Sequence, residues 1–83
     1  MRVRASDISA RTIGDETIVL SLSSSKYFTI TGVGTRLFEL LAEDRSLDDL
    51  IGAITSEYEI DADTARRDIE AFLGRLRDAE LLH

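Results

Sequence analysis

The sequence is poor in the residues that carry most protein chemistry. It has no cysteine, proline or tryptophan, and its one histidine, His83, ends the 83-residue sequence. The absence of cysteine excludes disulfides and cysteine-based zinc sites. A general base must be held in position, and the last residue is a poor place for one. The sequence therefore predicts no catalytic residue and no cofactor.

Metal and nucleotide motifs are incomplete. Metal sites need clustered histidine, cysteine or carboxylate ligands. Asp48, Asp49, Asp61 and Asp63 stand at expected helix starts, where the helix dipole alone favours acids. The run Gly32–Gly34 resembles a phosphate-binding loop, but the third glycine and the crossover strand are missing. We therefore expect neither a metal site nor a nucleotide site.

Basic residues are also scarce, with 10 Lys plus Arg against 16 Asp plus Glu and a net charge of −6. Nucleic-acid binding normally requires a basic surface, because phosphate neutralisation supplies much of the affinity. No apolar run approaches the roughly 20 residues that cross a bilayer. The start, MRVRASDISAR, is polar where a secretory signal is apolar. We expect a cytoplasmic protein that binds neither nucleic acid nor membrane.

The first third of the sequence predicts three strands, at residues 8–13, 17–22 and 26–30. Turn-forming residues, Gly14-Asp15-Glu16 and Ser23-Ser24-Ser25, separate them, which is typical of an antiparallel meander. The second strand alternates, with one apolar face. That face carries Ile18, Leu20 and Leu22.

The third strand, KYFTI, has two adjacent aromatic residues that must point to opposite faces of the sheet. Alternation places Phe28 and Ile30 together, and we expect them to face the helices. Tyr27 and Thr29 then face away. We expect Tyr27 to cover the back of the sheet near Val19.

The remaining sequence predicts three helices. Thr31 is the expected cap of the first, Ser46 with Asp49 forms an expected capping box for the second, and Asp61 caps the third. The third helix is expected to run to about Glu80, with two leucines folding back onto the core. The apolar stripes comprise Val33, Leu37, Leu40 and Leu41; Leu47, Leu50, Ile51, Ile54 and Tyr58; and Ala65, Ile69, Phe72, Leu73 and Leu76.

Strands followed by helices predict a single α+β domain over residues 1–83, in which a small antiparallel sheet packs on three helices. The third strand would lie at an edge of that sheet, and Lys26 is its only charge. Such an edge is either covered by the protein itself or open to a partner peptide that adds a strand. On the third helix, Phe72 with Asp68 and Arg75 forms either a groove wall or a plain stretch of core.

Three runs together resemble a known family: IVLSLSSSKYFTITGVGTRLFELL, SLDDLIGAITSEYEID and ARRDIEAFLGRLRDAELL. The resemblance spans about Ile8 to Leu82. It is to the PqqD-like family, the precursor-peptide recognition elements of ribosomally made, modified peptides. The sequence is most similar to the small stand-alone B1 proteins of lasso-peptide pathways.

The resemblance implies a winged-helix-like fold in which the leader segment of a precursor lies along the third strand. The leader would be an added antiparallel strand in a cleft against the third helix. The implied binding residues are Tyr27, Phe28, Thr29, Ile30, Asp68, Phe72, Arg75 and Leu76.

The resemblance also implies partners. A B1-type protein does no chemistry and presents the precursor to a B2-type, transglutaminase-like leader peptidase and to a macrolactam synthetase. Leader recognition in another pathway, of the pyrroloquinoline quinone or radical-enzyme type, is an alternative. A winged-helix DNA-binding protein is another alternative. Against it, the expected second helix, residues 46–60, carries four acids and no base.

Overall fold

The structure, a computed structural model, describes residues 1–4 and 8–82, so His83 lies outside the described residues. Three strands are followed by three helices, which confirms the α+β prediction; winged-helix-like describes the fold loosely. The elements are β1 (Ile8–Ile13), β2 (Glu16–Ser21), β3 (Lys26–Thr31), α1 (Val33–Leu40), α2 (Leu47–Glu57) and α3 (Ala62–Asp78).

The sheet is an antiparallel meander with strand order β1-β2-β3, as the turn signals predict. Gly14 has a φ of 63° in the turn between β1 and β2, a conformation that favours glycine. β2 begins and ends one residue earlier than the pattern predicts, so Leu22 lies in the following turn. β1 and β3 are the two edges.

The buried face of β2 carries Thr17 and Val19, and the apolar face with Ile18 and Leu20 points away from the helices. Thr17 and Val19 are fully buried, whereas Ile18 is 39% exposed on the face away from the helices. The expected position of Tyr27 near Val19 is wrong. Val19 lies opposite Phe28, and Tyr27 lies opposite Leu20.

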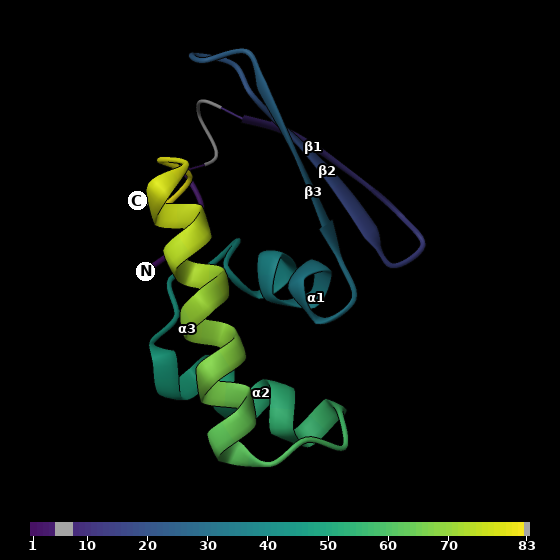
Figure 1. Cartoon of the computed structure of the whole chain (residues 1–83), viewed down its shortest axis with the longest axis vertical. Helices are drawn as coiled ribbons and strands as arrows, with labels where there is room; N and C mark the ends of the chain where they lie inside the picture. The colour runs from purple at the N-terminus through teal and green to yellow at the C-terminus, as the bar shows by residue number, and fades with distance from the viewer. Residues whose placement is uncertain (5–7, 83) are drawn as a thin grey trace.

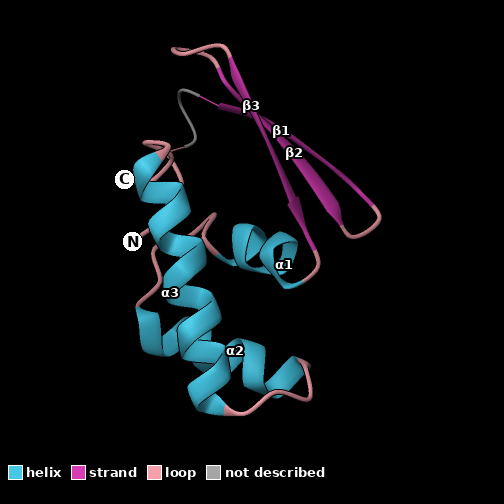
Figure 2. Cartoon of the chain, in the orientation of Figure 1, coloured by secondary structure: helices cyan, strands magenta, loops and turns pink. Residues whose placement is uncertain are grey.

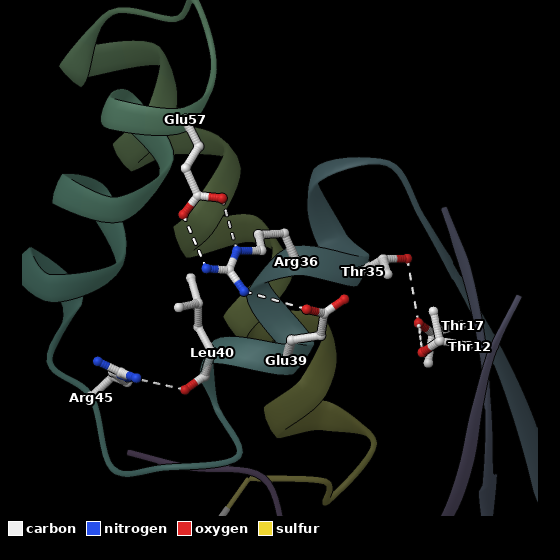
Figure 3. A network of polar contacts seen from close by, with 8 residues as sticks. All are labelled: Thr12, Thr17, Thr35, Arg36, Glu39, Leu40, Arg45 and Glu57. Carbon is white, nitrogen blue, oxygen red and sulfur yellow. Dashed lines mark hydrogen bonds and ion pairs between the residues drawn. The ribbon is translucent and has the colours of Figure 1, made fainter. Parts of the chain in front are cut away.

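A hydroxyl network explains why a polar residue occupies the buried face (Figure 3). Thr35 of α1 donates to the carbonyl of Asp15 at 2.7 Å and lies 3.2 Å from the carbonyl of Ile30. Thr17 donates to Thr35 at 3.4 Å and contacts Thr12 at 2.9 Å. Because these hydroxyls satisfy one another, Thr17 is buried without an unpaired polar group.

The start of α1 differs from the prediction. Thr31 is the last residue of β3, and Gly32, with a φ of 60°, is the N-cap, with no side-chain capping bond. The Gly32 N–H donates to the carbonyl of Asp15 at 3.1 Å. The ladder between β2 and β3 therefore continues into the junction, and Thr31 does not act as the cap.

The predicted caps of the other two helices are confirmed. The Ser46 hydroxyl accepts from the Asp49 N–H at 3.1 Å, and the Asp49 carboxylate accepts from the Ser46 N–H at 3.0 Å. The Asp61 carboxylate accepts from the Thr64 N–H at 2.8 Å. These backbone hydrogen bonds stabilise the charged carboxylates and lower the pKa of Asp49 and of Asp61.

The ends of α2 and α3 depart from their apolar stripes. Tyr58 is the C-cap of α2 and is 39% exposed. α3 ends at Asp78, two residues before the expected end, and Glu80 follows with a φ of 60°. This turn returns Leu81 to the core, where it is almost fully buried, as predicted.

The helices and the sheet form two bodies joined by α1 (Figures 1 and 2). α3 packs on α2, while α1 contacts both α2 and β3. The two chain ends lie close together, where Val3 forms a β-bridge with Leu82. Within the described ranges, every helix is too short or too polar to cross a bilayer. The apolar core consists of Val3, Val19, Ile30, Leu37, Leu40, Leu41, Leu50, Ile54, Ala65, Ile69, Phe72, Leu73, Leu76 and Leu81.

Candidate functional site

A small hollow of about 180 Å³ lies where β3, α1 and α3 meet. Its floor is apolar and comes from three elements: Ile30 of β3, Leu37 of α1 and Phe72 of α3 are each at least nine-tenths buried. The residues that line it are Thr29, Ile30, Thr31, Val33, Gly34, Leu37, Asp68, Phe72 and Arg75. The small hollow can therefore accept an apolar group against its floor.

Gly34 allows the three elements to approach one another. A β-carbon at this position would lie 2.6 Å from Cγ2 of Ile30 and 3.2 Å from Cε1 of Phe72. Both distances are shorter than ordinary van der Waals contact. The glycine is therefore needed for close packing around the hollow, and neither a phosphate site nor a positive φ accounts for it.

A large hollow of about 580 Å³ continues along β3 toward the hairpin and the end of α3. Phe28 and Ala79 supply apolar surface, and polar and charged side chains surround them. Its lining residues are Ser21, Ser23, Ser24, Lys26, Phe28, Arg75, Asp78, Ala79 and Glu80. Arg75 borders both hollows. We call the two hollows together the cleft.

Charged side chains surround the cleft without pairing with one another. Among the described residues, no ion pair involves Lys26, Asp68, Arg75, Asp78 or Glu80. These charges are free to meet complementary charges on a bound molecule. An elongated molecule that lies in the cleft would therefore lie beside both basic and acidic side chains.

The edge of β3 borders the cleft. The Gly32 N–H bonds to Asp15 of the β1–β2 turn, and bonded positions alternate along an antiparallel ladder. Ile30 and Phe28 therefore bond to β2. Tyr27 and Thr29 direct their N–H and C=O groups to the open edge, where no further strand pairs in the described part of the chain.

The structure brings most of the sequence-derived candidates together. Thr29, Ile30, Asp68, Phe72 and Arg75 all line the small hollow. Of the two flanks of α3, the one with Asp68, Phe72 and Arg75 therefore borders β3.

The other three candidates lie elsewhere. Phe28 lines the large hollow. Tyr27 is 73% exposed and is on the opposite face of the sheet, and Leu76 is buried in the core and lines neither hollow. Leu76 thus contributes core packing near the C-terminal end of α3.

Sequence reasoning missed the contribution of α1 to the small hollow. Val33, Gly34 and Leu37 lie in a helix that the pattern assigns to the core alone. The glycine in the first helical turn is the one usable signal, because glycine weakens a helix unless close packing requires it.

A metal site is not indicated. No group of three or more histidine, cysteine, aspartate or glutamate side chains gathers in residues 1–4 and 8–82.

Two solved structures are similar over nearly the whole fold. The first, "TbiB1 in Complex with the TbiA(beta) Leader Peptide", is 34% identical, with a TM-score of 0.90 over 100% of this chain and 95% of that one. The second, "Lasso peptide synthetase B1 complexed with the leader peptide", is 26% identical, with a TM-score of 0.82 over 96% and 93%. No curated protein sequence matches significantly.

The family comparison covers most of the chain. Residues 16–82 match the model of the family described as "Coenzyme PQQ synthesis protein D (PqqD)". The match includes β2, β3 and all three helices, and so contains every element that lines the cleft. The chain therefore belongs to the PqqD family.

Proposed function

We propose that this protein binds the leader segment of a lasso-peptide precursor, as a strand added to β3 within the cleft. The observation that carries the proposal is that the open backbone edge at Tyr27 and Thr29 lies beside two hollows walled by α3. Both similar solved structures are described as complexes with a leader peptide. The proposed binding residues are those that the sequence suggested, Tyr27, Phe28, Thr29, Ile30, Asp68, Phe72 and Arg75, without Leu76.

The site divides recognition into two parts. Backbone hydrogen bonds along β3 fix the register of any extended peptide, and the hollows select side chains. β3 runs from Lys26 beside the large hollow to Thr31 beside the small hollow. An antiparallel leader therefore places its N-terminal part at the small hollow and its C-terminal part at the large hollow.

The protein acts in this proposal as a cytoplasmic, single-domain recognition element with no catalytic role. It presents the precursor to a leader peptidase of the B2 type and to a macrolactam synthetase. A disordered leader loses conformational freedom on binding, and burial of apolar side chains in the cleft offsets that loss. The bound leader would then be held in one extended conformation while its remainder stays accessible.

Leader recognition in a pyrroloquinoline quinone or radical-enzyme pathway is the second candidate, and the family description favours it. The cleft itself suits either pathway, because strand addition depends on the peptide backbone. Neighbouring genes separate the two. A transglutaminase-like protease with an asparagine-synthetase-like ligase indicates a lasso pathway, and a radical SAM enzyme indicates the alternative.

The direct test is calorimetry or fluorescence polarisation with a synthetic leader from the precursor gene next to the gene of this protein. We expect saturable binding with one leader per protein, and none to a scrambled leader. Arg75→Gln, at an exposed position, should weaken binding with the circular dichroism unchanged. Phe72→Ala or Ile30→Ser should weaken it further, in samples that circular dichroism shows to be folded. Failure of the wild-type protein to bind this leader would refute the proposal.

A further inference from the structure

The face of the sheet that points away from the helices carries exposed apolar side chains among its polar residues, which include Ser9, Arg11, Glu16, Thr29 and Thr31. A sheet that packs on one side normally presents polar residues to solvent on the other. Here each strand or its adjoining turn contributes an exposed apolar side chain: Ile13 (64% exposed), Ile18 (39%), Leu22 (56%) and Tyr27 (73%). We call this surface the outer face. The core does not account for it, since the inner face is occupied by Val19, Phe28 and Ile30.

Tyr27 is the member of the outer face that stands on the β3 edge. Its partner across the sheet is Leu20, and the diagonal neighbour on that strand is Ile18. On the other side its backbone groups point to the open edge. A strand added there places one residue directly opposite Tyr27, on the same face, with the two β-carbons about 5 Å apart.

From this geometry we infer that Tyr27 is a second specificity contact, which packs against an apolar or aromatic side chain on the outward side of the bound leader. The inference rests on the proposed function and adds a second contact surface to it. The cleft would recognise the inward-facing residues of the leader, and Tyr27 would contact one outward-facing residue. Adjacent leader residues would therefore meet different surfaces of the protein.

An apolar partner is favoured by the surroundings of the ring. Leu20 and Ile18 are its neighbours on β2, so a charged residue opposite Tyr27 would lie beside apolar side chains that offer it no opposite charge. An aromatic, β-branched or aliphatic side chain would instead extend the apolar row across the added strand. Cross-strand aromatic and β-branched pairs of this kind stabilise sheets.

The test compares wild-type protein with Tyr27→Thr, which keeps strand propensity and removes the ring. Binding of the fluorescein-labelled synthetic leader to Tyr27→Thr should be about two- to five-fold weaker. Tyr27→Phe should bind as wild type does, because the ring makes the contact. Ile13→Thr is the matched control: Ile13 is 64% exposed on the same face but belongs to β1, two strands from the open edge. We expect no change for it.

An alanine scan of the leader against wild type and Tyr27→Thr identifies the residue opposite Tyr27 without assuming a register. One leader position should lose affinity with the wild type and lose none with Tyr27→Thr, because coupled residues are non-additive. The flanking positions should affect both proteins equally.

Each other outcome has a definite meaning. Unchanged binding by Tyr27→Thr, or no coupled leader position, overturns the inference and leaves the proposed function standing. Equal losses for Tyr27→Thr and Ile13→Thr also overturn it, and sedimentation then tests whether a second copy covers the outer face. If wild-type protein does not bind the leader, both proposals fall.

Discussion

Gly34 of α1 lies so close to Ile30 of β3 that a β-carbon on the glycine would be 2.6 Å from Cγ2 of the isoleucine. The isoleucine is branched and almost fully buried, so its Cγ2 atom has little room to move. Phe72 of α3 closes the other side, with Cε1 3.2 Å from the same position. The close approach of β3, α1 and α3 beside the cleft therefore requires a glycine at position 34.

We predict that Gly34→Ala lowers stability or leaves it unchanged, although alanine is the better helix former. Overpacking costs about 1–3 kcal/mol, and the gain in helix propensity returns about 1 kcal/mol. Leader binding should weaken as Ile30 and Phe72 shift into the small hollow. Gly52→Ala is the control, since nothing lies within 4 Å of its β-carbon position in α2. It should raise stability in urea denaturation, and a similar gain for Gly34→Ala would contradict the packing argument.

Thr29→Pro tests the open edge of β3. Proline lacks an N–H, and at an edge strand it is tolerated where that N–H faces away from the sheet. Because Thr29 directs its N–H outward, the variant should keep its circular dichroism and lose leader affinity. Phe28→Pro should instead disrupt the sheet, because its N–H bonds to β2. Unfolding by both variants would contradict the outward direction of the Thr29 N–H.

Thr35→Val tests the hydroxyl network beneath the sheet. Valine has nearly the same shape but removes the hydroxyl that donates to the carbonyl of Asp15 at 2.7 Å, and this carbonyl keeps the bond from the Gly32 N–H. The loss should be about 0.5–1.5 kcal/mol in urea denaturation, the usual net contribution of one hydrogen bond. Thr12→Val is the comparison, because Thr12 lies on the exposed edge strand. Its effect should be within about 0.5 kcal/mol of zero.

Helix capping predicts a loss of stability in acid. The usual pKa of an aspartate is 3.8, and the bond from the Thr64 N–H lowers the pKa of Asp61 in the folded protein. The contribution of the cap to stability is thus fully present above pH 3.8, the pKa of Asp61 in the unfolded protein. It disappears as the pH falls through the lower pKa of Asp61 in the folded protein. Asp61→Asn keeps a capping oxygen without the titration. Its thermal unfolding midpoint should fall less steeply below pH 4 than that of the wild type, and identical slopes would argue against this account.

Local signals in the sequence were sufficient for the order of the elements and for two caps. Asp49 three residues after Ser46 is a complete local pattern, and so the capping box forms as expected. Thr31 failed as a cap because its segment continues the ladder, with Gly32 bonded to Asp15. That bond joins residues 17 positions apart, and no helix-start pattern contains it.

The face of β2 shows a second limit of local reasoning. Alternation correctly separates Thr17 and Val19 from Ile18 and Leu20, but it does not say which set is buried. The buried Thr17 pairs with the hydroxyl of Thr35 from 18 residues away, a contact that no local pattern contains. The candidate cleft residues on α3 were identified because Asp68, Phe72 and Arg75 share one flank, a property of helical spacing alone.

The position of α1 has a consequence for engineering. This eight-residue helix is the element that contacts both β3 and α2, and α2 in turn carries α3. α1 therefore acts as a spacer that sets the distance between β3 and α3 across the cleft. A change in side-chain volume at the half-buried Val33 should alter the width of the cleft, whereas a change at Leu37 also disturbs the core. Libraries aimed at new peptide preferences can thus be built in the spacer as well as at the contact residues.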